Sequence, residues 1–224
     1  MSSAVSASPA RPFEVRHVQL ARALFAAMAA VMVTFSPDHS AAVGLAVFSG
    51  WAIATALVLL LSVWLVHPAG DRAAAVAIGV PTLVAGMVAG LPGLRSTTLF
   101  FVVVIAWALL TGLLELVIGL RRRATDEYAR DAVLIGALTL ALGVGLLLVN
   151  PAYSLEYFIT EARQSFVLTG ITIGVGLFGG YAAVIAVFLG IAGFSPRRES
   201  AADQQRSAEV AAAPTGTEAA GEHA

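Results

Sequence analysis

The chain has 224 residues, of which 58% are hydrophobic and 12% are charged, and its mean hydropathy is +0.86. A soluble domain carries about 25% charged residues, so half that proportion indicates a surface that largely faces lipid. The formal net charge of −1 excludes a strong overall field for nucleic acid, and we expect no nucleic-acid partner. The sequence contains neither cysteine nor lysine, which excludes disulfides, thiolate catalysis, Cys-ligated metals and lysine Schiff bases.

Six segments are long and apolar enough to cross a membrane, since a helix needs about 20 apolar residues to span roughly 30 Å of hydrocarbon. In chain order they are Val18–Phe35, Ala41–Val66, Ala73–Leu91, Leu99–Leu120, Ala132–Val149 and Phe166–Phe194. Their unbroken apolar runs exclude the alternating strands of a membrane barrel. The sequence therefore predicts an all-α, polytopic membrane protein.

The connections and the chain ends complete the predicted organisation. Pro37, Pro92 and Pro151 follow the first, third and fifth spans, which predicts three tandem helix-Pro-helix hairpins within a transmembrane domain of residues 18–194. Residues 1–17 and 195–224 are rich in alanine, serine and other small or polar residues. Such segments cannot bury a core, so both are expected to be disordered tails.

The distribution of arginine predicts how the helices are oriented. Two arginines, Arg95 and Arg163, fall on one side of the predicted spans. The others fall on or near the opposite side: Arg11, Arg16, Arg22, Arg72, Arg121, Arg122, Arg123, Arg130, Arg197, Arg198 and Arg206. Positive residues that flank spans are retained in the cytoplasm, so both termini are predicted to be cytoplasmic.

An internal repeat runs through the predicted spans. Ile78–Gly86 in the third span matches Ile135–Gly143 in the fifth, with glycine and threonine in register, and Trp51-x-x-x-Thr55 in the second matches Trp107-x-x-x-Thr111 in the fourth. The position of Glu115 corresponds to Leu59 in the first repeat and is predicted to correspond to Ala183 in the third. The third repeat is the most divergent.

Small residues are spaced for close helix packing, which lipid-embedded helices need because lipid supplies no hydrophobic drive between them. Three Gly-x-x-x-Gly pairs stand out, and two further glycines, Gly112 and Gly119, flank Glu115 in the fourth span. The pairs are Gly86 with Gly90, Gly170 with Gly174, and Gly176 with Gly180. We expect them to pack helices within one chain, with dimerisation as the alternative.

The fourth span carries a resemblance to a known family. The segment from Ala106 to Val117, with its Trp-Ala-x-x-Thr-Gly-x-x-Glu pattern, is followed by Arg121-Arg122-Arg123. Together with six spans in hairpin repeats, this resembles the HdeD-type acid-resistance membrane proteins over residues 18–194, most strongly from Leu99 to Pro151. The resemblance implies a bacterial inner-membrane protein associated with survival of acid stress and without an established enzymatic activity.

Glu115 is the acid placed deepest in a predicted span. An ionisable residue there is costly unless it is paired or neutral, which makes it a candidate functional residue. Trp107, Thr111 and Glu115 repeat at intervals of four, so the carboxyl group is expected to face neighbouring helices. Two interpretations remain open, a structural ion pair with Arg22 or Arg121 and a proton-linked role.

No other residue pattern indicates a catalytic or metal-binding site. His17, His39, His67 and His223 lie in different tails and loops without metal-ligand spacing, and no nucleophile or phosphate-binding motif is present. We therefore expect no enzymatic activity, cofactor or metal.

The connection from Ala152 to Ser165 combines Tyr153, Tyr157 and Phe158 with Glu156, Glu161 and Arg163. Aromatic residues four apart beside charges predict a short helix at the level of the lipid headgroups, and a partner-binding patch is the alternative.

The functional expectation is a non-enzymatic inner-membrane stress protein whose partners are the lipid bilayer and either further copies of the chain or another membrane protein. The alternative is a small transporter or channel in which Glu115 carries a proton. Transport would require several polar groups along a path through the membrane, and the spans offer one acid with a few threonines and serines.

Overall fold

The computed structural model describes residues 14–66, 72–124, 129–159 and 164–195. Six helices in this part of the chain are long and apolar enough to cross a membrane, which confirms the predicted fold class. They are α1 (Val15–Phe35), α2 (Ala41–Leu65), α3 (Arg72–Gly90), α4 (Thr97–Arg122), α5 (Ala129–Leu148) and α6 (Gly170–Phe194). A short 3-10 helix, η1 (Pro92–Leu94), joins α3 to α4, and two strands, β1 (Ser154–Ile159) and β2 (Gln164–Thr169), lie between α5 and α6.

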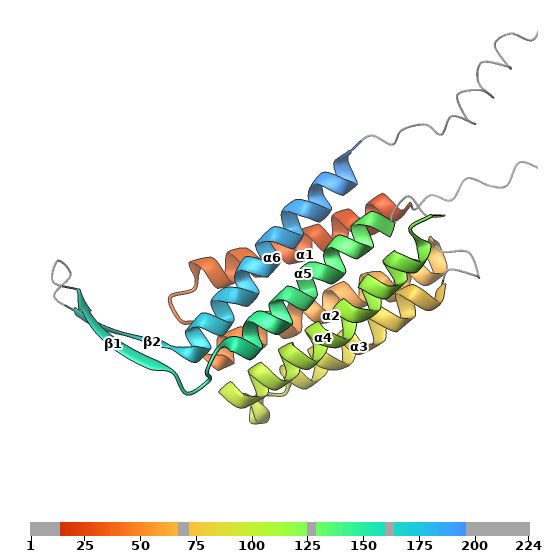
Figure 1. Ribbon diagram of the computed structural model, residues 1–224. Coiled ribbons are helices and arrows are strands. Elements are labelled where there is room, and N and C mark those ends of the chain that lie inside the picture. The colour runs from red at the N-terminus through yellow and green to blue at the C-terminus, as the bar shows by residue number, and fades with distance from the viewer. Residues whose placement is uncertain (1–13, 67–71, 125–128, 160–163, 196–224) are drawn as a thin grey trace, which may run out of the picture. The chain divides into compact units, whose positions relative to one another are not determined.

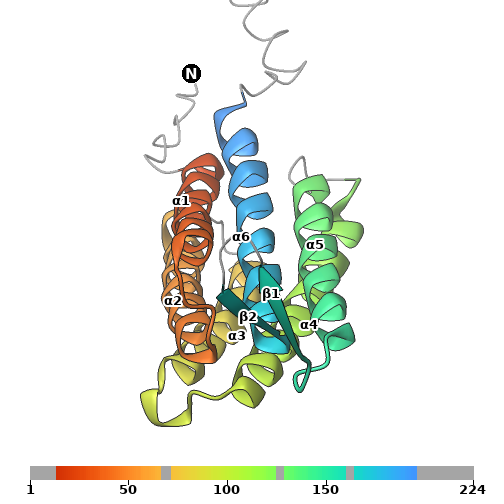
Figure 2. The same cartoon turned by 90° about the vertical axis from the view of Figure 1, so that its left-hand side faces the viewer.

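The six helices form a closed ring. Each packs against its neighbours in sequence, and α1 closes the ring against α6. Figure 1 shows the helices running side by side, and Figure 2 shows α6 between α1 and α5. The most extensive contacts join α2 to α3, α4 to α5 and α6 to α1. The predicted hairpins would instead pair α1 with α2, α3 with α4 and α5 with α6, whose contacts are present but smaller, so the tandem-hairpin arrangement stays a prediction.

Small residues allow two of the extensive contacts. A side chain added at Gly86 of α3 would meet Ile53 of α2 at 2.9 Å, and one added at Gly143 of α5 would meet Leu109 of α4, also at 2.9 Å. Gly136 of α5 approaches the backbone of α4 still more closely. Van der Waals contact between close backbones is the main attraction available to helices in lipid, so these glycines explain which helices pair.

The same principle joins α6 to α1. A side chain at Gly179 would meet Val33 of α1 at 2.6 Å, and one at Gly193 would meet Leu20 at 2.6 Å. The buried residues of α1 include Ala26, Ala29 and other small residues. The ring is thereby closed by the helices at the two ends of the described chain.

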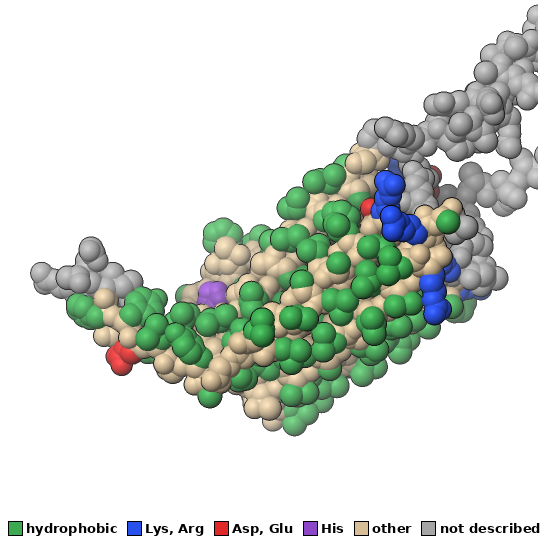
Figure 3. Space-filling model, viewed as in Figure 1, with side chains coloured by type: hydrophobic (Ala, Val, Ile, Leu, Met, Phe, Trp, Pro, Cys, Tyr) green, Lys and Arg blue, Asp and Glu red, His purple; other side chains and the backbone are tan. Residues whose placement is uncertain are grey.

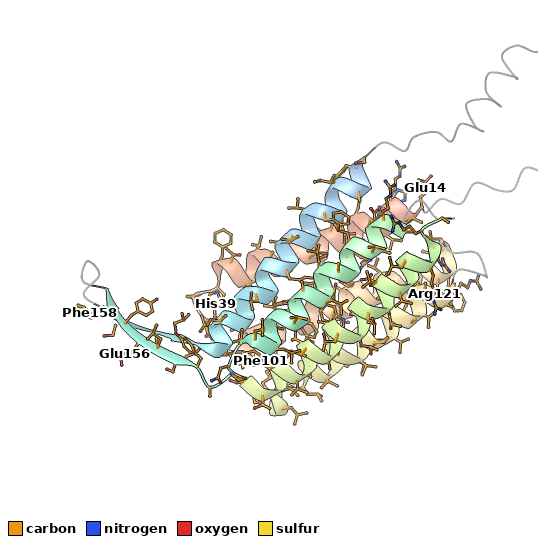
Figure 4. All side chains as sticks on the ribbon, viewed as in Figure 1. Glu14, His39, Phe101, Arg121, Glu156 and Phe158 are labelled. Atoms are coloured by element: carbon orange, nitrogen blue, oxygen red, sulfur yellow. The ribbon has the colours of Figure 1, made fainter. Side chains whose placement is uncertain are left out.

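The two ends of the bundle differ in charge. Arg121, Arg122 and Arg123 lie at the end where α4 finishes, which we call the arginine end. Blue side chains gather there in Figure 3, while green side chains cover the length of the bundle. The opposite end, which we call the hairpin end, carries η1 and the two strands. Figure 4 places Arg121 and Glu14 at the arginine end, and His39 and Glu156 at the hairpin end.

The observed helix ends lie close to the predicted ones at most positions. The helix α1 begins at Val15, three residues inside the segment predicted as the amino-terminal tail, and α4 extends to Arg122. Ser40 and Ser96 act as N-caps, since their hydroxyl groups accept hydrogen bonds from Val43 N and Leu99 N. Most of the predicted tails, residues 1–13 and 196–224, lies outside the described residues.

The connection after α5 corrects a prediction. Residues 154–159 and 164–169 form an antiparallel two-stranded sheet in which Glu156 pairs with Val167. The predicted headgroup-level helix is therefore wrong, and so is the predicted start of the sixth span at Phe166, because α6 begins at Gly170. Residues 160–163, which include Glu161 and Arg163, lie outside the described part of the chain.

Gly170 lies at the point where β2 ends and α6 begins, and the space there requires a glycine. Its N–H donates to Tyr153 O at 2.8 Å, and a side chain there would clash with Asn150 O. Residues 151–158 are all exposed, so the i, i+4 spacing of the aromatics, which had favoured a helix, has no buried face to support it. Strand pairing after Pro151 thus outweighs the local helical spacing.

The three Gly-x-x-x-Gly pairs have different environments. Gly86 and Gly90 pack against α2, where a side chain at Gly90 would meet Ser49 Oγ at 2.8 Å, and Gly174 packs against Phe100 and Phe101. Gly176 and Gly180 are exposed, and a side chain at either would meet no atom within 4 Å in the described structure. Packing within the chain, expected for all three pairs, is therefore wrong for this last pair.

Candidate functional site

Glu115 forms a buried ion pair with Arg22. Arg22 Nη2 donates to Glu115 Oε1 at 3.2 Å, joining α1 to α4 across the inside of the ring. The Glu115 residue is 5% exposed, and its side chain and that of Arg22 are 7% and 16% exposed. Arg121, the alternative partner predicted from the sequence, is exposed at the end of α4. The ion pair compensates two charges that would each be costly within an apolar bundle.

The pair belongs to a layer to which each helix contributes one residue. We call this set the charged layer. All its members line one cavity: Arg22, Leu59, Ile78, Glu115, Ile135 and Leu189. Arg22 occupies the place in α1 that Ile78 and Ile135 hold in α3 and α5. Glu115 occupies the place in α4 that leucine holds in α2 and α6. The ion pair is therefore a local charged replacement within an otherwise apolar layer.

Three aromatic rings fix the register of the repeat. Trp51, Trp107 and Tyr181 contact one another, with ring centroids 5.1 Å apart between the two indoles and 6.1 Å from each indole to the phenol ring. Tyr181 is therefore the third counterpart of the two tryptophans. Eight residues further on, the counterpart of Glu115 is Leu189, which corrects the predicted Ala183.

Threonines contact the aromatic layer, the name we give to Trp51, Trp107 and Tyr181. Trp107 Nε1 donates to Thr82 Oγ1 at 3.1 Å, and Tyr181 Oη lies 2.9 Å from Thr139 Oγ1. Thr111 Oγ1 donates to Trp107 O at 2.7 Å. These threonines are the repeated ones recognised in the sequence. Thr82 and Thr139 provide partners for the Trp107 N–H and the Tyr181 hydroxyl in an apolar interior, and the Thr111 hydroxyl satisfies its own donor on the carbonyl of the preceding helical turn.

Two cavities meet at the charged layer. The larger, which we call the arginine-end cavity, has a volume of about 160 Å³ and includes Gln19, Arg122 and Asp131 among its lining residues. The smaller, which we call the central cavity, has a volume of about 20 Å³ and is lined by Thr55, Thr111 and the three aromatic rings. Arg22 and Glu115 line both. A space of about 15 Å³ is enough for one water molecule, so the central cavity excludes organic substrates by size.

Aromatic and aliphatic side chains fill the bundle between the central cavity and the hairpin end. Phe48 and Phe178 are fully buried, with ring centroids 5.5 Å apart. Nearer the hairpin end, the ring of Phe100 lies 3.1 Å from the places where side chains of Gly44 and Gly174 would begin. The phenyl ring of Phe100 thus fills the space that the two glycines leave. The half of the helix bundle nearer the hairpin end is therefore a packed core.

Sequence reasoning missed part of the site. Gln19 and Tyr181 were not recognised, and Thr55 was recognised only as a member of the repeat, although all three side chains lie inside the ring of helices. Aligning α1 with the repeat would have found Gln19, because Ala23, Ala26 and Ala30 repeat the spacing of Gly79, Thr82 and Gly86. The third repeat has tyrosine in place of tryptophan and a longer preceding connection, which hid Tyr181.

The described residues include no group of three or more histidine, cysteine, aspartate or glutamate side chains that could hold a metal ion. His17 Nδ1 accepts a hydrogen bond from Glu14 N at the start of α1, and His39 lies at the hairpin end. His67 and His223 lie outside the described residues.

Comparisons with protein-family models, with curated proteins and with solved structures found no match to this chain.

Proposed function

We propose that this chain is a non-enzymatic, multi-pass protein of the bacterial inner membrane, of the HdeD type, that contributes to acid or general stress resistance. Both termini are cytoplasmic in this proposal, so the arginine end faces the cytoplasm. The bilayer is the immediate partner, with further copies of the chain or another membrane protein as candidates for assembly.

The observation that carries the proposal is the position of the motif residues. Trp107, Thr111 and Glu115, which carry the resemblance, lie inside the ring and contact three other helices through Arg22, Thr82 and Tyr181. The motif thus supplies the internal contacts of the bundle. The packed hairpin-end half and the size of the central cavity favour such a role over the passage of a solute.

A second candidate function, proton-linked transport through Glu115, is favoured by one observation. The carboxyl group lies where the arginine-end cavity meets the central cavity, so a proton arriving from that end would reach Glu115 before the aromatic layer. Such a position suits a proton-binding group.

The first experiment tests the stress role in the organism that encodes the chain. Deletion of the gene should lower survival in at least one of acid, osmotic and oxidative challenge, and the wild-type gene should restore survival. A gene that carries Glu156→Gln, introduced into the deletion strain, is the control for substitution of an acid, because Glu156 is an exposed acid on β1 outside the bundle. This variant gene should restore survival as well as the wild-type gene does. Unchanged survival of the deletion strain under all three challenges would contradict the proposal.

The second experiment separates the two candidate functions. Purified protein is reconstituted into liposomes that contain a pH-sensitive dye, and an inward proton gradient is applied. Proton uptake by the wild type that is abolished in Glu115→Gln and kept in Glu156→Gln would establish the transport function. Uptake equal to that of empty liposomes would reject it.

A further inference from the structure

The strands β1 and β2 form a two-stranded sheet that extends beyond the bundle. Within the described residues the two strands contact mainly each other, and β2 also contacts α6, the helix that follows it. Figure 1 shows the sheet leaving the hairpin end sideways, across the direction of the helices. A two-stranded sheet on its own is only marginally stable in water, so a surface that packs against one of its faces would stabilise it.

The two faces of this sheet differ in chemistry. Successive residues of a strand point to opposite faces, so alternate pairs of the register share a face. The tyrosine face, as we call it, has the pairs Leu155 with Leu168, Tyr157 with Phe166 and Ile159 with Gln164. The glutamate face has the pairs Ser154 with Thr169, Glu156 with Val167 and Phe158 with Ser165. Five of the six residues on the tyrosine face are apolar or aromatic, whereas four of the six on the glutamate face are polar.

The glutamate face is turned away from the bundle. Figure 4 shows Glu156 on the side of β1 that faces away from the helices, and red atoms mark that side of the sheet in Figure 3. The tyrosine face is therefore turned back toward the level of the helices. Leu148, the last residue of α5, is 82% exposed, so the apolar surface of the bundle continues to the base of the sheet. An apolar face of the sheet thus lies beside a surface that is itself suited to lipid.

The area and charge of the tyrosine face favour lipid over a protein partner. Two paired strands of six residues are about 20 Å long and about 10 Å wide, so one face offers about 200 Å². A specific protein interface needs about 800 Å² from each partner. Glu156 is the one charged residue of the two strands, and it lies on the other face. Lipid requires no minimum area, and a tyrosine ring suits the headgroup level because its body is apolar and its hydroxyl is polar.

We propose that the hairpin of β1 and β2 lies in the headgroup region of the bilayer that the six helices cross, with its tyrosine face toward the acyl chains and its glutamate face toward water. The outer edges of the two strands carry backbone groups that no described strand pairs. These groups meet water at the headgroup level, which the hydrocarbon would not allow. The inference rests on the proposed location of the helices in a bilayer and not on the proposed stress role.

The test measures the depth of single spin labels, since the sequence has no cysteine of its own. The full chain, at one copy per phosphatidylcholine nanodisc, is labelled at Leu155→Cys on the tyrosine face or at Ser165→Cys on the glutamate face. Collisions of the label with oxygen, which concentrates in lipid, are compared with collisions with a water-soluble nickel chelate. The ratio of oxygen to nickel collisions should be several-fold higher at residue 155. Equal ratios would overturn the proposal, and so would low collision rates with both reagents at residue 155, which indicate a covering protein surface.

Two charged variants test which face makes the contact. Tyr157→Glu places a charge on the tyrosine face and should lower the collision ratio of the label at residue 155 to that of the label at residue 165, because a charge resists transfer into lipid. Phe158→Glu is the matched control, since Phe158 is the next residue, is also aromatic and is 61% exposed on the glutamate face. It should leave the ratio unchanged. Equal effects of the two variants would contradict the assignment of the faces.

A label on a helix separates this inference from the proposed location in a membrane. Val144 is 50% exposed on α5, so a label at Val144→Cys should collide mainly with oxygen. Oxygen collisions at residue 144 together with nickel collisions at residue 155 would reject the docking of the hairpin alone. Nickel collisions at both residues would reject the membrane location as well.

Discussion

At the scale of single residues, the charged layer shows what the ion pair replaces. The repeat places isoleucine at two of the three positions equivalent to Arg22 and leucine at two of the three equivalent to Glu115. A pair that had only a structural role should therefore be replaceable by these residues, because apolar groups of similar volume often substitute for a buried ion pair without loss of stability.

The first prediction follows from this comparison. Arg22→Ile and Glu115→Leu should each lower stability by about 3–5 kcal/mol, because each leaves one buried charge without its partner. The double variant, which makes all three repeats alike, should recover most of the loss. Thermal unfolding of the four proteins in one detergent measures the effect. A double variant as unstable as the sum of the single variants would contradict the repeat register.

The second prediction concerns glycines in different environments. Gly136→Ala should destabilise the bundle by about 1–3 kcal/mol, because its side chain would lie 2.5 Å from Leu116 N and 2.8 Å from Gly112 O, and backbone atoms cannot move aside cheaply. Gly176→Ala is the matched control. Its side chain would meet no atom within 4 Å in the described structure, so stability should be unchanged or raised. Thermal unfolding compares the two variants, and equal losses would place Gly176 in a contact.

The residues that could be predicted from the sequence were those marked by an exceptional type. Glu115 stood out because it is an acid within an apolar run, and its pairing with Arg22 was one of the open alternatives. Gln19 and Tyr181 could not be recognised in the same way. Each belongs to the site because of its position in the repeat. The sequence alignment placed the third repeat in the wrong register, and it did not align the first span with the third and fifth.

At the scale of elements, hydropathy determined the six helices but not the segment between α5 and α6. Lipid imposes helices on apolar spans, since every backbone polar group must be satisfied within the segment. Outside the hydrocarbon this constraint is absent. Residues 154–159 and 164–169 then follow local pairing, and aromatic spacing alone could not distinguish a short helix from two strands.

The third prediction tests the strand register by disulfide formation. Because the sequence contains no cysteine, two introduced cysteines are the only thiols in the protein. Glu156→Cys with Val167→Cys should form a disulfide under mild oxidation, because side chains of directly paired strand residues have Cβ atoms about 4.5–5.5 Å apart. Glu156→Cys with Leu168→Cys is the control and should not, because adjacent strand residues point to opposite faces. Gel shifts with a polymer maleimide measure free thiols. A continuous helix would separate residues 156 and 167 by about 16 Å and prevent the bridge.

At the scale of the whole molecule, the sequence predicted the number of helices and not their closest partners. Short connections at the proline-containing turns suggested hairpins of α1 with α2 and of α3 with α4. The larger contacts instead follow the glycines, as where Gly86 brings α3 against α2 and Gly136 brings α5 against α4. Loop length constrains which helices are neighbours, whereas the depth of a contact depends on which faces carry small residues.

The last prediction concerns the orientation of this ring in the membrane. Arginines that flank spans resist translocation, and Arg121, Arg122 and Arg123 all lie where α4 ends, so that end should be cytoplasmic. Gly93 and Ala124 are exposed small residues at the hairpin end and the arginine end, and each can become the single cysteine of the chain.

In intact spheroplasts, an impermeant maleimide should label Gly93→Cys and leave Ala124→Cys unlabelled, and both should react after lysis. Lysis serves as the control for thiol reactivity, because it exposes both faces of the membrane to the reagent. The reverse pattern would place the arginine-end cavity and the termini outside the cytoplasm. In the transport proposal, the proton that reaches Glu115 would then come from the external medium, so the labelling result decides on which side of the membrane the arginine-end cavity lies.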